Sequence, residues 1–588
     1  MKKTAFLLSV LMFMAMSTSQ LFSQQNAEDK KFQKFLDSYF EAYWEFYPTA
    51  ATLAGFHDND DELEDFRERN LEKRHDELDA FNQELVAEID RQKLSLEFQI
   101  DHAMMVDALD RDLIQHEMLL PWEYNPIFYN RIFLSCIRSL FVKEFAPLET
   151  RAKNAESRLK DLEKFIGQAK ENLKTPAEIY TQTAIEQFPT IMNFYQNELP
   201  GLIDLTPDDV KAKLQANLAE VIPALSDYQN FLEKELLPKS TGNFRLLEAH
   251  ARLVRTTFQN NIPVQELAAQ AQVDAKNIRT EMFKVCFAFY KIMDPKFDIE
   301  NPPANLSQDQ LINSVVSHVL DKIKSDHVEK DAFLDKVKSL TGEIKDHLQE
   351  NQLAELPPDN LEIVSAPPEA LATSWLNLVP PAPYETDGTF TLQITPFPED
   401  MEADKLQSLR EEYTKTFLPF WVTANVYPGC FVPAVKTNSG ASLIRKLYPN
   451  KPVLEGWSYM FGEDMVKTGY GNYNLRPRLN QLKFDLRVVI NFIIEFQIHQ
   501  NVMTKDEAVA YMTRVGFFTQ GEAERMWDEI LLNPLKSAYA YVGLQEYKAL
   551  EKEYKELKGE TFNRREFLSE VLNHGAIPFR FLKQKIIQ

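Results

Sequence analysis

Nine prolines fall between residues 357 and 398, and they restrict what the chain can fold into more than any other feature. They are Pro357, Pro358, Pro367, Pro368, Pro380, Pro381, Pro383, Pro396 and Pro398. Each lacks an amide N–H and clashes with the preceding helical turn, so no helix can continue through this spacing. Within the segment, residues 389–395 alternate apolar and polar side chains and predict a β-strand, and residues 361–364 predict a second one.

The rest of the chain has the pattern of amphipathic helices. Phe32, Phe35, Leu36, Tyr39, Phe40 and Tyr43 recur at helical spacing. Glycine makes up only 17 of 588 residues, under half its usual share of about 7%, so tight hairpins should be few. Capping-box patterns predict helix starts at Thr175, Ser307, Thr504 and Thr519. The sequence therefore predicts a mainly α fold, a large helical body with a small β-sheet.

The N-terminus has the pattern of a secretory signal. Lys2 and Lys3 precede an apolar run from Ala5 to Met16, and small polar residues follow. No cysteine lies near the expected cleavage site, so a lipid anchor is not expected there. We expect a signal peptide over residues 1–24, no integral membrane segment after its cleavage, and a soluble protein that is periplasmic or secreted.

Composition limits the partners. The net charge is −23, from 65 Lys+Arg and 88 Asp+Glu, and such a field repels polyanions, so no nucleic-acid partner is expected. Three scattered cysteines are too few for a disulfide framework; Cys136 and Cys286 are predicted to fill apolar cores. No G-x-S-x-G, H-E-x-x-H or C-x-x-C motif is present.

Several short motifs, in their order along the chain, resemble one bacterial family. They are Pro48 to Asp58, Trp122 to Pro126, the Glu455-Gly456-Trp457 triplet, His499 followed by Thr504 and Glu507-Ala508, and Phe562 to Phe567 before Pro578. The chain is similar to the family known as domain of unknown function 885 (DUF885) from Phe32 to Leu582. The resemblance implies a fold like that of helical gluzincin-type zinc metallopeptidases.

The expected organisation follows from the proline-rich segment and from this resemblance. An N-terminal helical region over 25–356 precedes the connector at 357–398, and a C-terminal helical region over 399–588 carries the metallopeptidase-like motif. Residues 25–588 together are expected to form one family-length unit.

The resemblance also implies a metal motif, His-Glu-x-x-Pro-Gly-His-His, with the Glu of Glu-Gly-Trp as a further ligand. The matching positions here are Ala424, Asn425, Pro428, Gly429, Cys430 and Phe431. Alanine and phenylalanine offer no lone pair, and asparagine cannot accept a proton at neutral pH. Cys430 and Glu455 alone are fewer than the three protein ligands that catalytic zinc usually has. We therefore expect no zinc cofactor.

These changes favour an exported, catalytically inactive homologue of a zinc metallopeptidase that binds peptides or a protein partner in the former substrate cleft. One alternative is a hydrolase of altered chemistry in which Cys430 acts with Glu455 or His499. A second alternative is a non-enzymatic envelope scaffold. The sequence leaves the oligomeric state open.

The predicted strand supplies candidate peptide contacts. Gluzincin-like proteins hold substrates along an edge strand, through main-chain hydrogen bonds. Thr391 and Gln393 are therefore candidates on the strand, and Tyr427 is a candidate beside the Pro-Gly turn.

Overall fold

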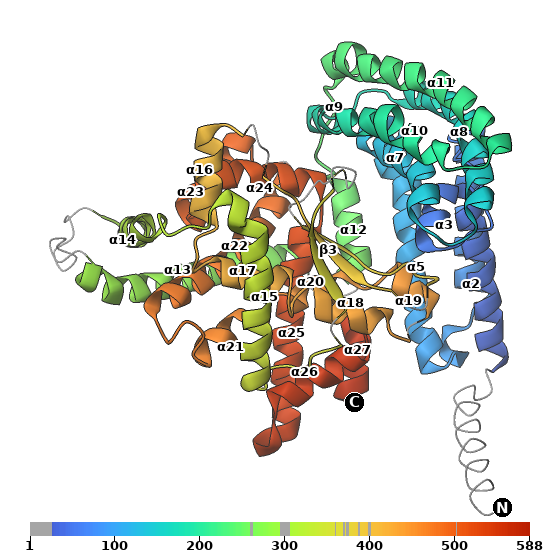
Figure 1. Ribbon diagram of the computed structural model, residues 1–588. Coiled ribbons are helices and arrows are strands. Elements are labelled where there is room, and N and C mark those ends of the chain that lie inside the picture. The colour runs from blue at the N-terminus through green and yellow to red at the C-terminus, as the bar shows by residue number, and fades with distance from the viewer. Residues whose placement is uncertain are drawn as a thin grey trace, which may run out of the picture.

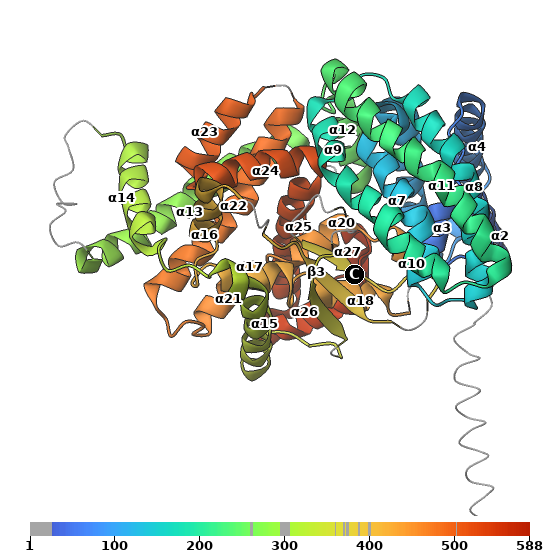
Figure 2. The same cartoon turned by 45° about the horizontal axis from the view of Figure 1, so that its top comes forward.

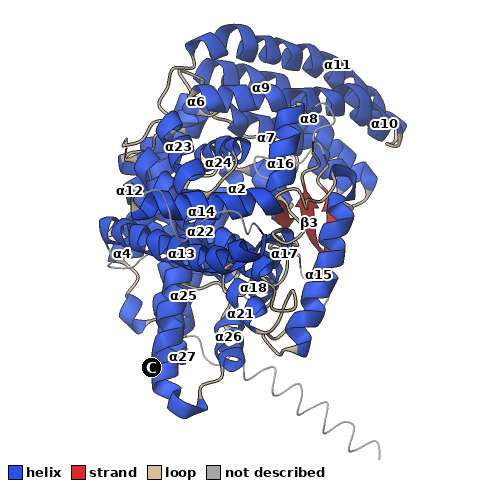
Figure 3. Cartoon of the chain, turned by 90° about the vertical axis from the view of Figure 1, so that its left-hand side faces the viewer, coloured by secondary structure: helices blue, strands red, loops and turns tan. Residues whose placement is uncertain are grey.

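The structure is a computed structural model, mainly helical with one small sheet (Figures 1 to 3). It describes residues 26–258, 263–293, 306–358, 360–367, 371, 376–385, 388–397, 401–440, 442–500 and 502–588. The signal peptide predicted for residues 1–24 lies outside this range. Within the described part of the chain, no helix has both the length and the apolarity needed to cross a bilayer.

The first part of the chain forms a helical bundle, blue to green on the right of Figure 1. Its helices are α2 (Ala27–Phe46), α3 (Pro48–Ala54), α4 (Glu68–Ala87), α5 (Leu96–Ile114), α6 (Pro121–Tyr124), α7 (Pro126–Val142), α8 (Leu148–Asn172), α9 (Glu178–Asn193), α10 (Leu199–Asp204) and α11 (Asp208–Phe231). The apolar stripe predicted from Phe32 is confirmed, because it forms most of the buried face of α2. Cys136 is buried in the bundle core, as predicted.

One buried arginine holds the segment from Pro48 to Asp58. Arg158 of α8 is fully buried and donates to five oxygens of this segment and its neighbours. The acceptors are the carbonyls of Pro48, Asn59, Glu62 and Cys136 and the Thr52 hydroxyl, at 2.7–3.2 Å. This motif is therefore a structural anchor that fastens α3 and the following loop to α8.

The next helices pack on the C-terminal half of the chain, and the first of them also packs on α5 of the bundle. They are α12 (Glu248–Phe258), α13 (Val264–Met293), α14 (Gln308–Ile323) and α15 (Phe333–Glu350). Side chains of α13 and α14 share an apolar core with the long helix α22 (Leu475–His499), and Figure 1 shows α13 and α14 on the side away from the bundle. We call residues 27–236 the bundle and the remaining described residues the second body; side chains of α2 to α5 share one apolar core with the second body.

The sheet has three strands in the order β1-β3-β2. β1 (Leu361–Ser365) pairs parallel with β3 (Phe390–Ile394), and β2 (Leu376–Val379) pairs antiparallel with β3. Both predicted strands, β1 and β3, are confirmed. The apolar side chains of β3 are buried, and Figure 3 shows the sheet among helices, with α15 beside it.

The C-terminal helices, orange to red in Figure 1, complete the second body. They are α16 (Ala403–Glu412), α17 (Leu418–Asn425), α18 (Phe431–Asn438), α19 (Leu443–Leu447), α20 (Lys451–Trp457), α21 (Gly462–Lys467), α23 (Lys505–Gly516), α24 (Gln520–Leu532), α25 (Lys536–Lys558), α26 (Arg564–Asn573) and α27 (Phe579–Ile586), with α22 among them. Most side chains in the C-terminal part of α22 are buried.

Three of the four predicted capping boxes are confirmed. Ser307, Thr504 and Thr519 each exchange two hydrogen bonds with the third helical residue. The prediction at Thr175 is wrong. Ala177 pairs with Thr241 in a short β-bridge, so the chain stays extended there and α9 begins only at Glu178.

We expect Arg158→Met to lower the free energy of unfolding by about 3–5 kcal/mol, because removal of a buried charged donor leaves several buried acceptors unpaired. Thermal and urea unfolding monitored by circular dichroism would measure the change. Lys160→Met, two residues further along α8 on an exposed side chain, is the matched control and should change stability by less than about 0.5 kcal/mol. Equal stability of the two variants would contradict the structural role of Arg158.

Candidate functional site

The segment that matches the metal motif forms the turn between α17 and α18. A Cβ at Gly429 would lie 1.9 Å from the Ala424 carbonyl oxygen, and the Gly429 amide donates to the Thr423 carbonyl at 3.0 Å. Only glycine fits this close approach. The Pro-Gly pair is therefore explained by the turn itself, whether or not a metal binds beside it.

Most side chains of this segment belong to the core. Ala424 is buried in a cluster with Phe417, Phe420 and Phe484. Phe431 is fully buried, with its ring 5.5 Å from that of Phe390 and 5.7 Å from that of Tyr427. Tyr427 is 2% exposed, which corrects its assignment as a peptide contact, because a buried ring cannot reach a ligand in a cleft.

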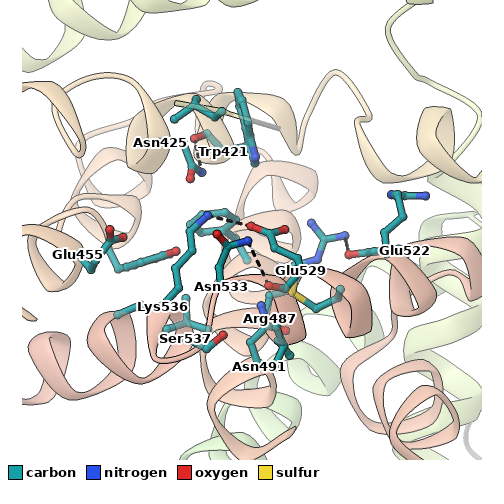
Figure 4. Close-up of a pocket in the computed structure, with 18 of the residues that line it drawn as sticks. Trp421, Asn425, Glu455, Arg487, Asn491, Glu522, Glu529, Asn533, Lys536 and Ser537 are labelled. Carbon is teal, nitrogen blue, oxygen red and sulfur yellow. Dashed lines mark hydrogen bonds and ion pairs between the residues drawn. The ribbon is translucent and has the colours of Figure 1, made fainter. Parts of the chain in front are cut away.

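Asn425 is the motif position that remains in a cavity. It lines a cavity of about 130 Å³ together with Trp421 and Glu455, and its amide donates to the Trp421 carbonyl at 3.0 Å. Figure 4 shows it above Lys536 and Asn533 of the helix below. An amide at this position can donate and accept hydrogen bonds but cannot act as a general base.

Two glycines bring Glu455 to the cavity. A Cβ at Gly456 would lie 2.3 Å from the Gly543 carbonyl carbon, and a Cβ at Gly543 would lie 1.9 Å from the Pro452 carbonyl oxygen. Helices α20 and α25 therefore touch backbone to backbone at this crossing. The close contact explains the glycine of Glu-Gly-Trp and places Glu455 near the first turn of α25.

Lys536, at the start of α25, is a site residue that sequence reasoning did not select. Its ammonium lies 2.8 Å from a carboxylate oxygen of Glu529, and in Figure 4 it reaches across the cavity between Asn425 and Asn533. Burial lowers its pKa, but the charges of Glu529 and Glu455 outweigh burial and hold the pKa well above its usual range. The lysine therefore stays protonated at neutral pH and supplies the cavity with a permanent positive charge.

A buried glutamate fixes the turn that carries Lys536. Glu495 of α22 is 1% exposed and accepts from the backbone amides of Leu535 at 2.8 Å, Ser537 at 3.0 Å and Ala538 at 3.3 Å. A carboxylate at a helix N-terminus satisfies unpaired donors and complements the helix dipole. Leu535 has a left-handed backbone, with φ of 73°, which these bonds hold in place.

His499 belongs to the layer beneath this turn. It stacks on His250 at 4.6 Å and accepts from the Leu246 amide at 3.2 Å, while His250 contacts Glu495 at 3.3 Å. His499 lines none of the three cavities described for this cleft. The structure therefore places it behind the site and not beside Cys430.

Cys430 is half-buried and lies near Glu455. Burial, with a smaller contribution from the Glu455 charge, raises the pKa of its thiol to about 12. A thiol needs a neighbouring base or a lowered pKa to act as a nucleophile, and the charge of Glu455 acts in the opposite direction. The geometry thus brings Cys430 and Glu455 together but supplies no activation of the thiol.

The two residues expected to bind a peptide along a strand edge, Thr391 and Gln393, lie on the central strand of the sheet. β3 is central, so both of its main-chain edges already pair with β1 and β2. Thr391 and Gln393 therefore cannot offer an edge to a peptide, which corrects that expectation. The edge strand near the cavity is β2, whose Leu376 and Asn377 line the cleft. Sequence reasoning missed β2 because its four residues are too few for a recognisable alternation.

Three cavities share lining residues and together form the cleft: two lie between the bundle and the second body, and the 130 Å³ cavity lies within the second body. Glu455, Lys536, Asn533 and Leu376 line both the 130 Å³ cavity and a larger one of about 740 Å³ against α7. A third cavity of about 920 Å³ lies between α9 and α24 and shares Arg525 and Glu529 with the first. In Figure 2, α7 and α9 lie in the bundle on the right, and α20 and α24 lie to their left.

Ion pairs of the body form another wall of the cleft. Arg487 pairs with Glu522 and Arg525 pairs with Glu412, and all four side chains line the smallest cavity. The Arg487 guanidinium also lies over the Phe417 ring, 4.1 Å from its centroid. These charges are neutralised locally, so they shape the wall and add little net field.

The residues at the motif do not fit a zinc ion. Of the expected ligand positions, Ala424 and Phe431 have no donor atom, and the ammonium of Lys536 lies where its charge acts on Glu455. A fixed cation beside the remaining carboxylate repels a divalent ion. Elsewhere in the described chain, one group has ligand atoms within 4.8 Å of one another, namely His75, Asp79 and Glu117, and none of these lines the cleft.

The buried histidine predicts a specific pH dependence. Burial, aided by the neighbouring His250, lowers the pKa of His499 to about 3, against about 6.5 in an unfolded chain. As the pH falls below 6.5, the unfolded chain takes up a proton here and the folded chain does not. The contribution of neutral His499 to the free energy of unfolding is therefore fully present above pH 6.5. It decreases between pH 6.5 and pH 3, by up to about 1.4 kcal/mol per pH unit.

We therefore compare how far the free energy of unfolding falls when the pH is lowered from about 7 to about 5. We expect a smaller fall in His499→Gln than in the wild type, measured by urea unfolding at each pH. His75→Gln, on a half-exposed histidine of α4, should keep the wild-type pH dependence. If His499→Gln and the wild type lost the same stability over this range, the predicted titration would be refuted.

Comparison with known proteins agrees with the fold. A structure from Shewanella oneidensis, described as a proposed lipoprotein of unknown function, is 24% identical, covers 95% of this chain and 100% of its own, and superposes with a TM-score of 0.79. A proposed lipoprotein from Colwellia psychrerythraea is 14% identical, with 94% and 98% covered and a TM-score of 0.71. None of the curated proteins compared matches the sequence.

The family profile described as "Bacterial protein of unknown function (DUF885)" matches residues 48–586, which is nearly all of the described chain. The family suggested by the short motifs is thus confirmed. This chain belongs to the DUF885 family of bacterial proteins.

Proposed function

We propose that this chain is an exported protein that binds an extended peptide segment in the cleft between its bundle and its second body, without hydrolysing it. The observation that carries the proposal is the position of β2, an edge strand of the sheet, along the wall of a large cavity. The groups that hydrolysis would require at the metal-motif positions are replaced, whereas the space and the strand edge beside them are retained.

The edge of β2 supports a peptide as ligand. Main-chain N–H and C=O groups on an unpaired strand edge can bind another extended chain, largely independently of its sequence. Leu376 and Asn377 of β2 line the 740 Å³ cavity opposite α7. A peptide added at this edge would occupy the space between the sheet and the bundle.

The chemistry of the site supports binding without cleavage. Peptide hydrolysis needs an activated nucleophile and a group that stabilises the developing oxyanion. Asn425 is no base, and the Cys430 thiol is held protonated. Lys536 could stabilise an anion, but among the described residues of the cavity it has no activated nucleophile beside it. The open cavities also speak against a scaffold whose cleft is filled by its own side chains.

Export is inferred from two observations. The first 24 residues have the charge and apolar pattern of a signal peptide, and the two similar structures are described as proposed lipoproteins. A periplasmic or secreted location would expose the cleft to peptide segments of other exported proteins.

The proposal is tested by selecting peptides from a random phage-displayed library on the purified mature chain. We expect enriched peptides to bind reversibly and to stay intact by mass spectrometry. Ser135→Trp fills the cavity from α7 and should weaken binding by about tenfold or more, equivalent to about 1.4 kcal/mol.

Ser226→Trp on α11 is the matched control. Ser226 is also half-buried, and its hydroxyl donates to the carbonyl four residues earlier, as that of Ser135 does; it lines none of the cleft cavities. Thermal unfolding would verify that both variants fold. Binding unaffected by Ser135→Trp, failure to enrich any peptide, or cleavage of the bound peptides would each overturn the proposal.

A further inference from the structure

Basic side chains gather at one end of the cleft, although the whole chain carries a charge of −23. Among the residues that the structure describes, five basic side chains and one acidic side chain, that of Glu455, line the 740 Å³ cavity. The basic residues are Arg131, Arg138 and Lys143 of α7, Lys451 of α20 and Lys536 of α25. We call this cavity the basic chamber.

Two of these charges have no acidic partner. Arg131 and Lys451 are exposed to the chamber and form no ion pair with any described residue. Lys143 lies 3.6 Å from Glu385, and Lys536 is paired with Glu529. Positive charges facing one another across a concave space raise its potential, because the low-dielectric walls focus the field. The chamber therefore attracts anionic groups more strongly than an open surface with the same charges.

A buried hydroxyl adds a second polar feature. Ser139 of α7 lines the same chamber and is 7% exposed, and its Oγ has no hydrogen-bond partner among the described residues. A buried polar atom without a partner costs free energy. A ligand with an acceptor oxygen near α7 would satisfy it.

The other end of the cleft has the opposite charge. The 920 Å³ cavity between α9 and α24 is lined by Glu178, Glu186, Asp528 and Glu529 against Lys505 and Arg525. Burial, and then the charge of Asp528, raise the pKa of Glu186. Charge is thus separated along the cleft, so a ligand with negative charge in one part fits better than a uniformly charged polymer.

We propose that the peptide bound in this cleft carries an acidic segment, whose carboxylates lie in the basic chamber beside Arg131, Lys451 and the Ser139 hydroxyl. This inference rests on the proposed function and defines the class of peptide. A nucleic acid is the other polyanion to consider. The strand edge of β2, the acidic far chamber and the strongly negative net charge all favour a short acidic peptide over it.

Isothermal titration calorimetry with the mature chain tests the inference. The probes are a peptide in which a run of glutamates follows a run of alanines, and the same peptide with glutamine in place of every glutamate. We expect the glutamate peptide to bind about tenfold or more tightly than the glutamine peptide, with the difference shrinking as salt rises.

Two double variants locate the effect. Arg131→Gln with Lys451→Gln should abolish the preference for the glutamate peptide. Arg69→Gln with Lys160→Gln removes the same charge from exposed positions outside the cleft and should preserve it. Because all four side chains are exposed, both variants are expected to fold, and thermal unfolding verifies this.

The remaining outcomes separate this inference from the function on which it rests. Equal binding of the two peptides would overturn the acidic preference and leave peptide binding intact. If neither the glutamate peptide nor the glutamine peptide bound, the inference would be overturned. Whether the chain binds peptides at all would still be tested independently by the library selection. Retention of the preference in Arg131→Gln with Lys451→Gln, or displacement of the glutamate peptide by an equally charged single-stranded oligonucleotide, would also overturn it.

Discussion

The candidate site depends on one ion pair, between the ammonium of Lys536 and the carboxylate of Glu529, with Glu455 acting on the same charge. The ammonium of Lys536 therefore supplies a positive charge to the cavity beside the segment that matches the metal motif. This cation is held by a layered arrangement. Glu495 caps the first turn of α25 from below, and His250 and His499 pack beneath Glu495. The backbone contact between α20 and α25 sets the position of Glu455. A cavity organised in this way can bind polar groups, but its positive charge opposes a metal ion.

The same arrangement explains which parts of the family pattern have a structural origin. Pro428 and Gly429 form a turn that excludes any side chain at residue 429, and Gly456 allows two helices to touch. The motif that begins at Pro48 is fastened by the hydrogen bonds of Arg158. These residues therefore have structural roles that do not depend on a metal. The resemblance to a family identifies a fold more securely than it identifies an activity.

Much of the fold could be predicted from the sequence, because local patterns fix it. The stripe of α2, the alternation of β3 and three capping boxes each reflect interactions within a few residues. The failures involve distant partners. Ala177 pairs with Thr241, so α9 starts later than its capping pattern indicates. β2 has only four residues and exists through its pairing with β3, which also moves the free edge away from Thr391 and Gln393.

The candidate site was harder to predict for the same reason. Cys430 and Glu455 do lie near each other, as the motif order suggested, but His499 is on the far side of α25's first turn. Lys536 and the basic side chains of α7 come together only through tertiary packing. Lys536 alone has a signal, because it stands at a helix start, where a basic residue is unfavourable unless acids lie near.

The measurement that tests the central claim most directly is the zinc content of the mature chain, loaded with zinc at neutral pH, desalted and examined by elemental analysis. The account predicts well below one zinc per chain, unchanged by Glu455→Gln, because the positive charge of Lys536 acts on that carboxylate and repels a divalent ion. One zinc per chain that is lost in Glu455→Gln would contradict it, since Glu455 would then be a metal ligand and the site a working metal centre.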